Sequence, residues 1–132
     1  MWQQEGILNM KIGMMLGFEE SINTITTIAR EAENAGINSL YTVDAGRSAT
    51  VTAAAVINAT EKAQVGTYIV NAWAREPWIT GLEARDLNEI SNRRFVLRVG
   101  TGNLHFNELY MGINSTKSKD KMRDFMNIVK AV

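Results

Sequence analysis

The sequence predicts an α/β fold with a parallel sheet, built from four successive strand–loop–helix units. Apolar runs at residues 12–16, 40–43, 65–70 and 95–99 are each followed by a glycine-containing or polar loop and then by a segment of helical periodicity. Their spacing of roughly 30 residues is the size of one βα unit, and such alternation is typical of a parallel sheet covered by helices. A closed (β/α)₈ barrel has eight strands in about 250 residues, so this chain holds about half of one.

The four apolar runs are continuous and do not alternate with polar residues. Continuous runs indicate strands that are buried on both faces. Right-handed crossovers give the neighbour order 1-2-3-4 if the sheet is wound in one direction. A doubly wound sheet would change direction, and the pattern is compatible with either.

The first unit begins with a strand at residues 11–16 that ends at Gly17. We expect Ser21 to cap the following helix and Gly36 to end it as a left-handed residue. The apolar stripe predicted for this helix comprises Ile22, Ile25, Ile28, Ala29, Ala32 and Ala35.

The second unit has a strand at residues 39–43, ending at Asp44, and a helix at residues 49–59. The helix consists almost entirely of small and apolar side chains. A helix with so few polar positions is buried on more than one side.

The third unit has a strand at residues 64–70 that ends at Asn71. Pro77 predicts the first residue of the next helix, because proline loses no hydrogen bond there and presets φ. In this helix Trp78 is expected in the core. Asn92 is expected to adopt the left-handed turn before the fourth strand.

The fourth strand, residues 95–99, runs into Gly100-Thr101-Gly102-Asn103. No helix is expected to open there; a loop to about residue 116 is expected instead. The last helix then presents one apolar face, formed by Met122, Phe125, Met126 and Val129.

Composition excludes several classes of protein. Fourteen basic residues balance fourteen acidic ones, and no basic stripe predicts nucleic-acid binding. The absence of cysteine removes disulfides, thiolate metal sites and a cysteine nucleophile. No apolar run approaches the ~18 residues of a membrane span. We therefore expect a cytoplasmic protein with neither a nucleic-acid nor a membrane partner.

The domain boundary is expected near Met10, which directly precedes the first strand and could itself be a start. Residues 1–9 carry Glu5 and two glutamines, so they do not form a signal peptide. We treat residues 1–9 as an extension and residues 10–132 as the folded domain.

Polar residues and glycines gather where the predicted strands end, at Gly17, Asp44, Asn71 and residues 100–103. In parallel α/β folds, ligands bind at this edge because loops surround the strand ends there. The position of these residues predicts a ligand site more strongly than any one of them does.

The Gly100-Thr101-Gly102 loop only partly matches a dinucleotide fingerprint, since His105 stands in place of the third glycine. A loop whose backbone approaches a ring or a phosphate fits better, because glycine permits close contact. A plain tight turn is the alternative.

Each other candidate side chain has two interpretations. Asp44 could orient a ligand, or it could cap a helix or pair with Arg47. Asn71 could bind a cofactor carbonyl or only close its loop. Arg75 could pair with a phosphate or carboxylate, or lie solvated on the surface.

His105 is the only histidine, so any imidazole acid–base chemistry depends on it. The alternative is a surface residue on a loop. Trp73 and Trp78 flank Arg75 and could line an aromatic pocket. No group of histidines or carboxylates has metal-ligand spacing, so no metal site is predicted.

Three stretches resemble the luciferase-like monooxygenases, in the same order and spacing. The run AENAGINSLY at residues 32–41, with Asp44, resembles their AExxGFDSLWxxD stretch. Residues 66–77 are similar to GTxVxNxxxRxP, and residues 87–102 to LDELSxGRFxLGxGTG. The likeness extends over residues 10–132.

The resemblance implies a TIM barrel that binds FMN or coenzyme F420 and catalyses hydride transfer or, with FMN, oxygen activation. The branch similar to the methylenetetrahydromethanopterin reductases carries a non-proline cis peptide behind the ring, which would fall at Tyr68–Ile69. The implied cofactor contacts are Asp44, Tyr68, Ile69, Asn71, Gly100, Thr101, Gly102 and Asn103. The resemblance assigns no catalytic residue to this chain, and the candidates from the residues themselves are Asp44 and His105.

The chain departs from the family pattern at three positions near the implied ring. Ala45 stands where many members have histidine, and Asn103 where the F420 branch often has glutamate. Tyr68 replaces the glycine usual at the cis step. Because Asn103 cannot act as an acid, these changes affect the implied proton transfer more than the implied cofactor site.

The expected function is that of a luciferase-like flavin- or F420-dependent oxidoreductase acting on a small molecule, present as a truncated, N-terminal half barrel. The alternative is a non-catalytic half barrel that forms a homodimer or pairs with a complementary C-terminal half. An open four-strand sheet favours some partner, since its edges and apolar surface would otherwise stay exposed. A truncated product without stable function is the third possibility.

Overall fold

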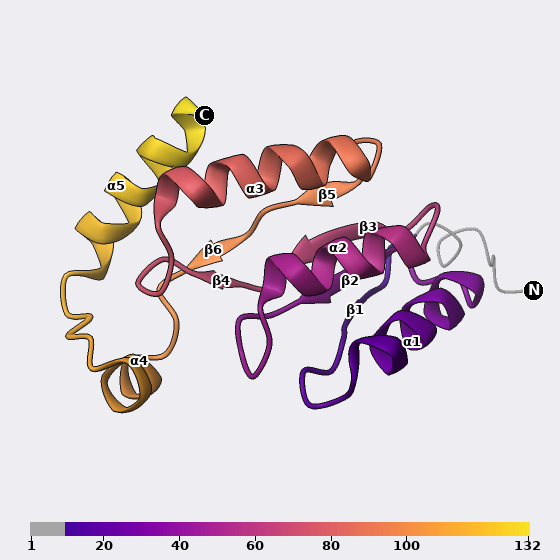
Figure 1. Cartoon of the computed structure of the whole chain (residues 1–132), viewed down its shortest axis with the longest axis horizontal. Coiled ribbons are helices and arrows are strands. Elements are labelled where there is room, and N and C mark those ends of the chain that lie inside the picture. Colours follow the sequence, from indigo (N-terminus) through magenta and orange to yellow (C-terminus); the bar gives the residue numbers. More distant parts are fainter. Residues whose placement is uncertain (1–9) are drawn as a thin grey trace, which may run out of the picture.

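Parallel strands in the order β1-β2-β3-β5 form the main sheet of the computed structural model, which describes residues 10–132 (Figure 1). The pair β4–β6 continues it as a second parallel ladder. The strands are β1 (Gly13–Met15), β2 (Ser39–Thr42), β3 (Gln64–Thr67), β4 (Val70–Asn71), β5 (Phe95–Val96) and β6 (Val99–Gly100). This order confirms the parallel α/β prediction and a sheet wound in one direction. The expected extension at residues 1–9 lies outside the described residues.

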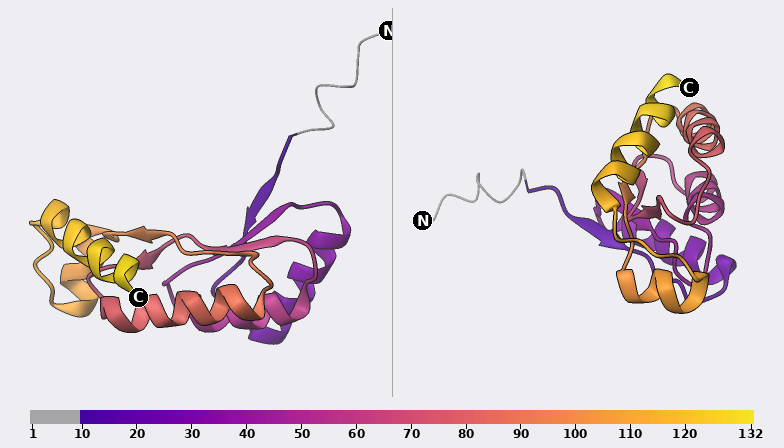
Figure 2. Two further views of the ribbon diagram at one scale, coloured as in Figure 1. Left: turned by 90° about the horizontal axis from the view of Figure 1, so that it is seen from above. Right: turned by 90° about the vertical axis from the view of Figure 1, so that its left-hand side faces the viewer.

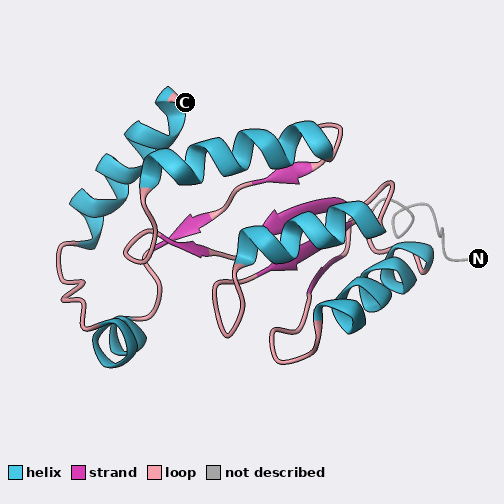
Figure 3. Ribbon diagram, viewed as in Figure 1, coloured by secondary structure: helices cyan, strands magenta, loops and turns pink. Residues whose placement is uncertain are grey.

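Each helix from α1 to α4 follows a strand along the chain, and α5 follows α4 directly, as Figure 3 shows. They are α1 (Ile22–Asn34), α2 (Ala49–Ala59), α3 (Pro77–Ile90), α4 (Leu104–Met111) and α5 (Ser118–Ala131). Figure 2 shows that α1, α2 and α3 lie along the same face of the sheet, whereas α4 and α5 lie beyond its β4–β6 end.

The third and fourth predicted strands are each divided in two. The break in the third lies between Thr67 and Val70, at a cis peptide bond between Tyr68 and Ile69. The break in the fourth lies between Val96 and Val99. The cis bond is therefore at the step that the family resemblance implied.

The core lies between the sheet and the helices α1, α2 and α3. Leu40 pairs in register with Met14 on one side and with Val65 on the other. Leu40 and Val65 are completely buried against the helices, together with Ala29 of α1 and Val56 of α2. These apolar contacts are the main source of stability for a parallel sheet.

The opposite face of the sheet is not covered by the described residues, so the expected burial on both faces is met on one face only. Met15 and Tyr68 on this open face are 54% and 58% exposed. Tyr41 lies between them, paired in register with Met15 and with its ring 6.2 Å from that of Tyr68. Apolar strands therefore reach solvent on this side.

The predicted helix boundaries of α1 and α3 are confirmed. The Ser21 side chain accepts a hydrogen bond from the backbone N–H of Thr24 at 3.1 Å, and Gly36 follows α1 with φ +92°. Pro77 opens α3, and Asn92 has φ +53°. The stripe predicted for α1 is too wide, because only Ile25, Ala29 and Ala32 of it are buried.

Helix α2 is buried on more than one side, as its composition predicts. It packs against α1 on one flank and α3 on the other, and also contacts β2 and β3. Its buried residues are Ala49, Thr50, Thr52, Ala53, Val56 and Ile57. The apolar face of α5 is confirmed as well, with Phe125 only 1% exposed.

Two further expectations are wrong. Trp78 is half exposed, because the buried face of α3 runs through Thr80 and Leu87, and nine residues separate Trp78 from Leu87. That separation is about 900°, which places Trp78 on the opposite face. The expected loop after Gly102 contains the helix α4, capped by Asn103 and ended by Gly112 at φ +64°.

Candidate functional site

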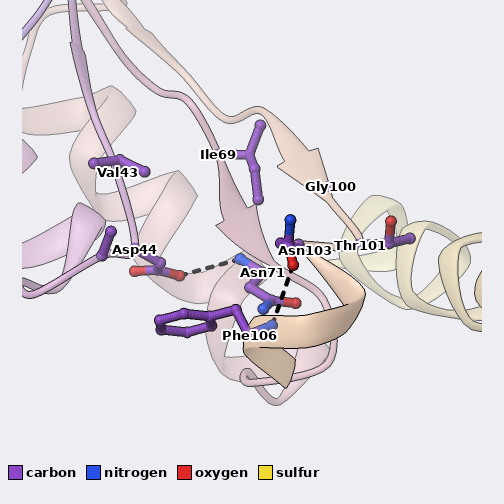
Figure 4. Close-up of a pocket in the computed structure, with 10 residues that line it drawn as sticks. Val43, Asp44, Ile69, Asn71, Gly100, Thr101, Asn103 and Phe106 are labelled. Carbon is purple, nitrogen blue, oxygen red and sulfur yellow. Dashed lines mark hydrogen bonds between the residues drawn. The ribbon is translucent and has the colours of Figure 1, made fainter. Parts of the chain in front are cut away.

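A pocket of about 650 Å³ lies at the carboxyl ends of the strands (Figure 4). Its walls are Val43, Asp44 and Ala45 after β2, Ile69 and Asn71 of the β3–β4 segment, Gly100, Thr101, Gly102 and Asn103 after β6, and Phe106 of α4. The structure therefore brings together seven of the predicted cofactor contacts. Tyr68 and His105 do not line this pocket.

Asp44 is bound by donors from three other segments. Its carboxylate accepts from the backbone N–H of Ala49 at 2.9 Å and of Asn71 at 3.1 Å (Figure 4). The guanidinium of Arg75 donates to both oxygens, from Nε and from Nη2, each at 2.7 Å. Asp44 thus caps α2 and pairs with an arginine, but the arginine is Arg75 and not Arg47.

Arg75 is not a solvated surface residue. Its side chain is 15% exposed and also donates to Glu83 at 3.0 Å and to Ser48 at 3.1 Å. The carboxylate alternative for Arg75 is therefore the one that the structure shows. Through it, the loops after β2 and β4 are joined to α3.

The pKa values of the pair follow from these contacts. Burial alone would raise the pKa of Asp44, but hydrogen bonds from Arg75, Ala49 and Asn71 outweigh it and hold that pKa below its ordinary value. The hydrogen bond with Asp44 raises the pKa of Arg75. Both groups remain charged at neutral pH, so Asp44 has no proton to donate there.

Asn71 is buried beneath the loop that follows β6. Its Oδ1 accepts from the backbone N–H of Trp73 at 3.0 Å, and its Nδ2 donates to Oδ1 of Asn107 at 2.8 Å. The Asn107 amide in turn donates from Nδ2 to the carbonyl of Thr101 at 2.9 Å. Asn71 therefore closes its loop and is also linked across the pocket wall.

Asn107 and Phe106 are the site residues that the sequence reasoning missed. Both lie in α4, which was expected to be a loop. The available signal was the helix-capping pattern, with Asn103 at the N-cap and a glycine just past the last turn. On a helix, Asn107 comes one turn after Asn103 and so returns to the strand ends.

The glycines of the 100–103 loop fit against residues of the chain itself. Gly102 has φ +67°, and a Cβ there would lie 2.9 Å from Oδ1 of Asn107. A Cβ on Gly100 would lie 2.9 Å from Cγ1 of Ile69. Both positions therefore need glycine for packing, whatever else approaches the loop.

The loop ends directly in a helix, contrary to expectation. The side chain of Asn103 accepts from the backbone N–H of Phe106 at 3.1 Å (Figure 4). His105 is exposed on α4, outside the pocket lining. In Figure 4, Phe106 extends from the start of α4 toward Asp44, and Thr101 points away from the pocket.

A cluster of aromatic and basic side chains lies on the open face of the sheet. The guanidinium of Arg98 stacks 4.2 Å above the ring of Tyr41, beside Tyr68. A hydrogen bond with Ser39 and the nearby Arg98 lower the pKa of Tyr41. Within residues 10–132, no carboxylate forms a salt bridge with Arg98.

Neither a metal-binding cluster nor a membrane-spanning helix is found within residues 10–132. This part of the chain contains no group of three or more histidines, cysteines or carboxylates arranged to hold a metal ion. Over the same residues, no helix has the length and apolar character needed to cross a membrane.

A sequence model of the family described as luciferase-like monooxygenase matches residues 7–132. The chain belongs to this family. A Mycobacterium tuberculosis protein, classed by name as a coenzyme F420-dependent oxidoreductase, is 26% identical over 126 residues. That alignment covers 93% of this chain and 36% of the relative.

Solved structures of the luciferase-like type share the fold. The coenzyme F420-dependent tetrahydromethanopterin reductase of Methanopyrus kandleri superimposes with a TM-score of 0.80 at 20% identity, over 90% of this chain and 39% of that one. An FMN complex of a type II Baeyer–Villiger monooxygenase from Pseudomonas putida gives 0.75 at 19% identity, over 91% and 38%. The TIM-barrel-type βα units are thus confirmed, and the chain spans about two fifths of these proteins.

Proposed function

We propose that this chain is the cofactor-binding part of a luciferase-like oxidoreductase that uses coenzyme F420 or FMN and acts on a small-molecule substrate. The observation that carries the proposal is the pocket at the strand ends, where Asp44, Asn71 and residues 100–103 converge. The relative named for F420 and the neighbours named for F420 and FMN support this choice of cofactors.

The residues of the pocket fit a flat, partly polar ring system. Val43, Ile69 and Phe106 supply apolar walls, and the loop around Gly102 exposes backbone at the rim. A volume of about 650 Å³ lies in the range of small-molecule sites. A flavin or deazaflavin bound here would supply hydride transfer or, with FMN, oxygen activation.

Proton transfer is proposed to depend on residues outside this pocket lining. Asp44 is the only ionisable side chain among the lining residues, and its ion pair with Arg75 keeps it charged. Ala45 and Asn103 carry no ionisable group. His105, the only histidine in the sequence, is exposed on α4 and does not belong to the lining. The catalytic acid or base is therefore expected from a complementary half of the barrel or from the substrate.

Cofactor titration tests the proposal. FMN and F420 are titrated separately into the purified chain, and cofactor fluorescence and visible absorbance are recorded. Saturable binding of at least one of them at a stoichiometry of about one per chain supports the proposal. If neither cofactor binds, the proposal is wrong.

The alternative function, a non-catalytic half barrel that binds a partner, is favoured by the open face of the sheet. Met15 and Tyr68 are exposed there, and Arg98 has no carboxylate partner among residues 10–132. A complementary half that covers this face and supplies a carboxylate would satisfy both features. Light scattering tests self-pairing, since a clean monomer excludes the homodimer.

A further inference from the structure

We infer that Asn107 is a positioning residue of the cofactor pocket. Its side chain links the two strands, β4 and β6, that form one wall of the pocket. This inference rests on the proposed function, because it assigns Asn107 a role in cofactor binding. It adds a residue that lies outside the three motifs of the family resemblance and does not line the pocket itself.

The contacts of Asn107 connect three separate segments. Its Oδ1 accepts a hydrogen bond from Nδ2 of Asn71, at the end of β4, and its Nδ2 donates to the carbonyl of Thr101, just after β6. Asn107 itself belongs to α4 and is completely buried. One amide therefore links both strands of the β4–β6 ladder to the helix beneath the pocket.

These contacts fix the orientation of the Asn71 amide. Trp73 donates to the oxygen of that amide, and Asn107 accepts from its nitrogen, so a flipped amide would set like groups against each other at both ends. Because Asn71 lines the pocket, its fixed orientation determines which polar atom a ligand meets. Asn107 thereby acts on the ligand through Asn71.

Asn107 also holds the glycine loop in place. The carbonyl of Thr101, which accepts from Asn107, belongs to the peptide bond that joins Thr101 to Gly102. The backbone of Gly102 in turn passes close to the side chains of Asn71 and Asn107. A buried carbonyl that loses its donor costs free energy and turns toward another partner. Loss of the Asn107 amide would therefore displace the part of the loop that borders the pocket.

The decisive variant is Asn107→Asp, which keeps the shape and the acceptor but loses the donor to Thr101. Ionised, its carboxylate faces a carbonyl oxygen; protonated, its hydroxyl can donate as the amide does. Burial raises the pKa of a carboxyl group, so the side chain of this variant is expected to change between its ionised and protonated forms within the pH range of ordinary buffers. Asn107→Leu removes both contacts, and Ser91→Ala serves as the control.

Ser91 is a matched control because it is also buried and hydrogen bonded, but at the start of the turn before β5. Its loss lowers stability without touching any residue that lines the pocket. All variants are titrated with FMN and with F420, and the visible absorption spectrum of the bound cofactor is compared with that of the wild type. Unfolding in urea is followed in parallel.

At about pH 8, Asn107→Asp is expected to weaken cofactor binding about tenfold and to change the spectrum of the bound cofactor. Lowering the pH to about 5 should restore both, relative to the wild type under the same conditions. Ser91→Ala should bind within about twofold of the wild type. Either Asn107 variant that folds suffices for the comparison with Ser91→Ala.

Two results overturn the inference, and they are distinguishable. If the wild type binds and the Asn107 variants bind equally well with unchanged spectra, Asn107 is only structural and the proposed function stands. If the wild type binds neither cofactor, the proposed function fails and the inference fails with it. Failure of both Asn107 variants to fold would likewise show that the residue is required for the fold and overturn its specific role.

Discussion

Arg75 binds both carboxylate oxygens of Asp44, with its Nε and Nη2 each 2.7 Å from an oxygen. Asp44 lies two residues after the end of β2, and Arg75 lies in the loop before α3, so the pair joins two neighbouring βα units at the edge of the pocket. Both side chains are about 15% exposed. Because the pair is so shielded from solvent, removal of one partner would leave the charge of the other largely buried and unpaired.

Removing the guanidinium should therefore destabilise the chain. We expect Arg75→Met to lower the free energy of unfolding by about 2–3 kcal/mol, because Asp44 stays buried without its partner. Arg123→Met is the matched control, since Arg123 pairs with Asp120 while 63% exposed, and its loss should be much smaller than that of Arg75→Met. Urea unfolding measures both. Equal losses would contradict the assigned role of the pair.

The lowered pKa of Asp44 predicts a specific dependence of stability on pH. Its contribution is fully present above the unfolded pKa of about 3.9 and is lost as the pH falls through the lower folded pKa. Asp44→Asn should be less stable than the wild type near pH 7 but lose less stability below about pH 4. If the free energies of unfolding of the two proteins, measured by urea unfolding at several pH values, run parallel between about pH 7 and pH 3, the ion pair does not control stability in this pH range.

The pKa of Glu33 is also lowered in the folded protein, so Glu33 makes stability depend on pH in the same direction as Asp44. Glu33 therefore limits how much of the loss of stability in acid is removed by Asp44→Asn alone. Burial raises its pKa, but hydrogen bonds from the backbone N–H groups of Ala63, Glu61 and Lys62 outweigh this and leave it lowered. The double variant Asp44→Asn with Glu33→Gln should therefore be flatter in acid than either single variant. Unfolding in urea at several pH values gives the comparison.

Two glycines with positive φ allow backbone strain to be separated from packing. Gly112 has φ +64° and open space within 4 Å of the position a Cβ would take, so Gly112→Ala should cost only the left-handed penalty of about 1 kcal/mol. Gly102 has φ +67° and a Cβ there would press on Asn71 and Asn107. Gly102→Ala should therefore cost at least about 1 kcal/mol more and weaken cofactor binding, whereas Gly112→Ala should leave binding unchanged.

The exposed position of Trp78 predicts an unusual result for a tryptophan. Trp78→Ala should lower the free energy of unfolding by less than about 1 kcal/mol, since half of the side chain is already in solvent. Phe125→Ala should cost about 3–4 kcal/mol because Phe125 is only 1% exposed. Thermal unfolding of the two variants should give clearly different midpoints. A larger loss at position 78 would contradict its placement.

Much of the fold could be predicted because local rules and packing agree. The Ser21 cap, the Gly36 stop and the Pro77 start each depend on a few neighbouring residues, and all three are confirmed. The strand order follows from right-handed crossovers between short units. Helix α4 was missed because its polar face carries the buried Asn107, which periodicity alone does not distinguish from a loop residue.

The candidate site was predicted by position and not by the roles of its side chains. The strand-end rule identified Asp44, Asn71 and the glycine loop, which line one pocket. Sequence could not show that Arg75 neutralises Asp44, because the two are 31 residues apart and their contact depends on the fold. The link between Asn71 and Asn107 spans 36 residues and was hidden for the same reason.

The most direct test of the central claim is to locate the bound cofactor by NMR. Amide signals of the ¹⁵N-labelled chain are recorded while FMN or F420 is added. The largest shifts are expected for Asp44, Asn71 and residues 100–103. No shifts, or shifts confined to the hollow lined by Arg30, Glu33 and Lys62 at the other end of the strands, would contradict a cofactor site at the carboxyl ends of the strands.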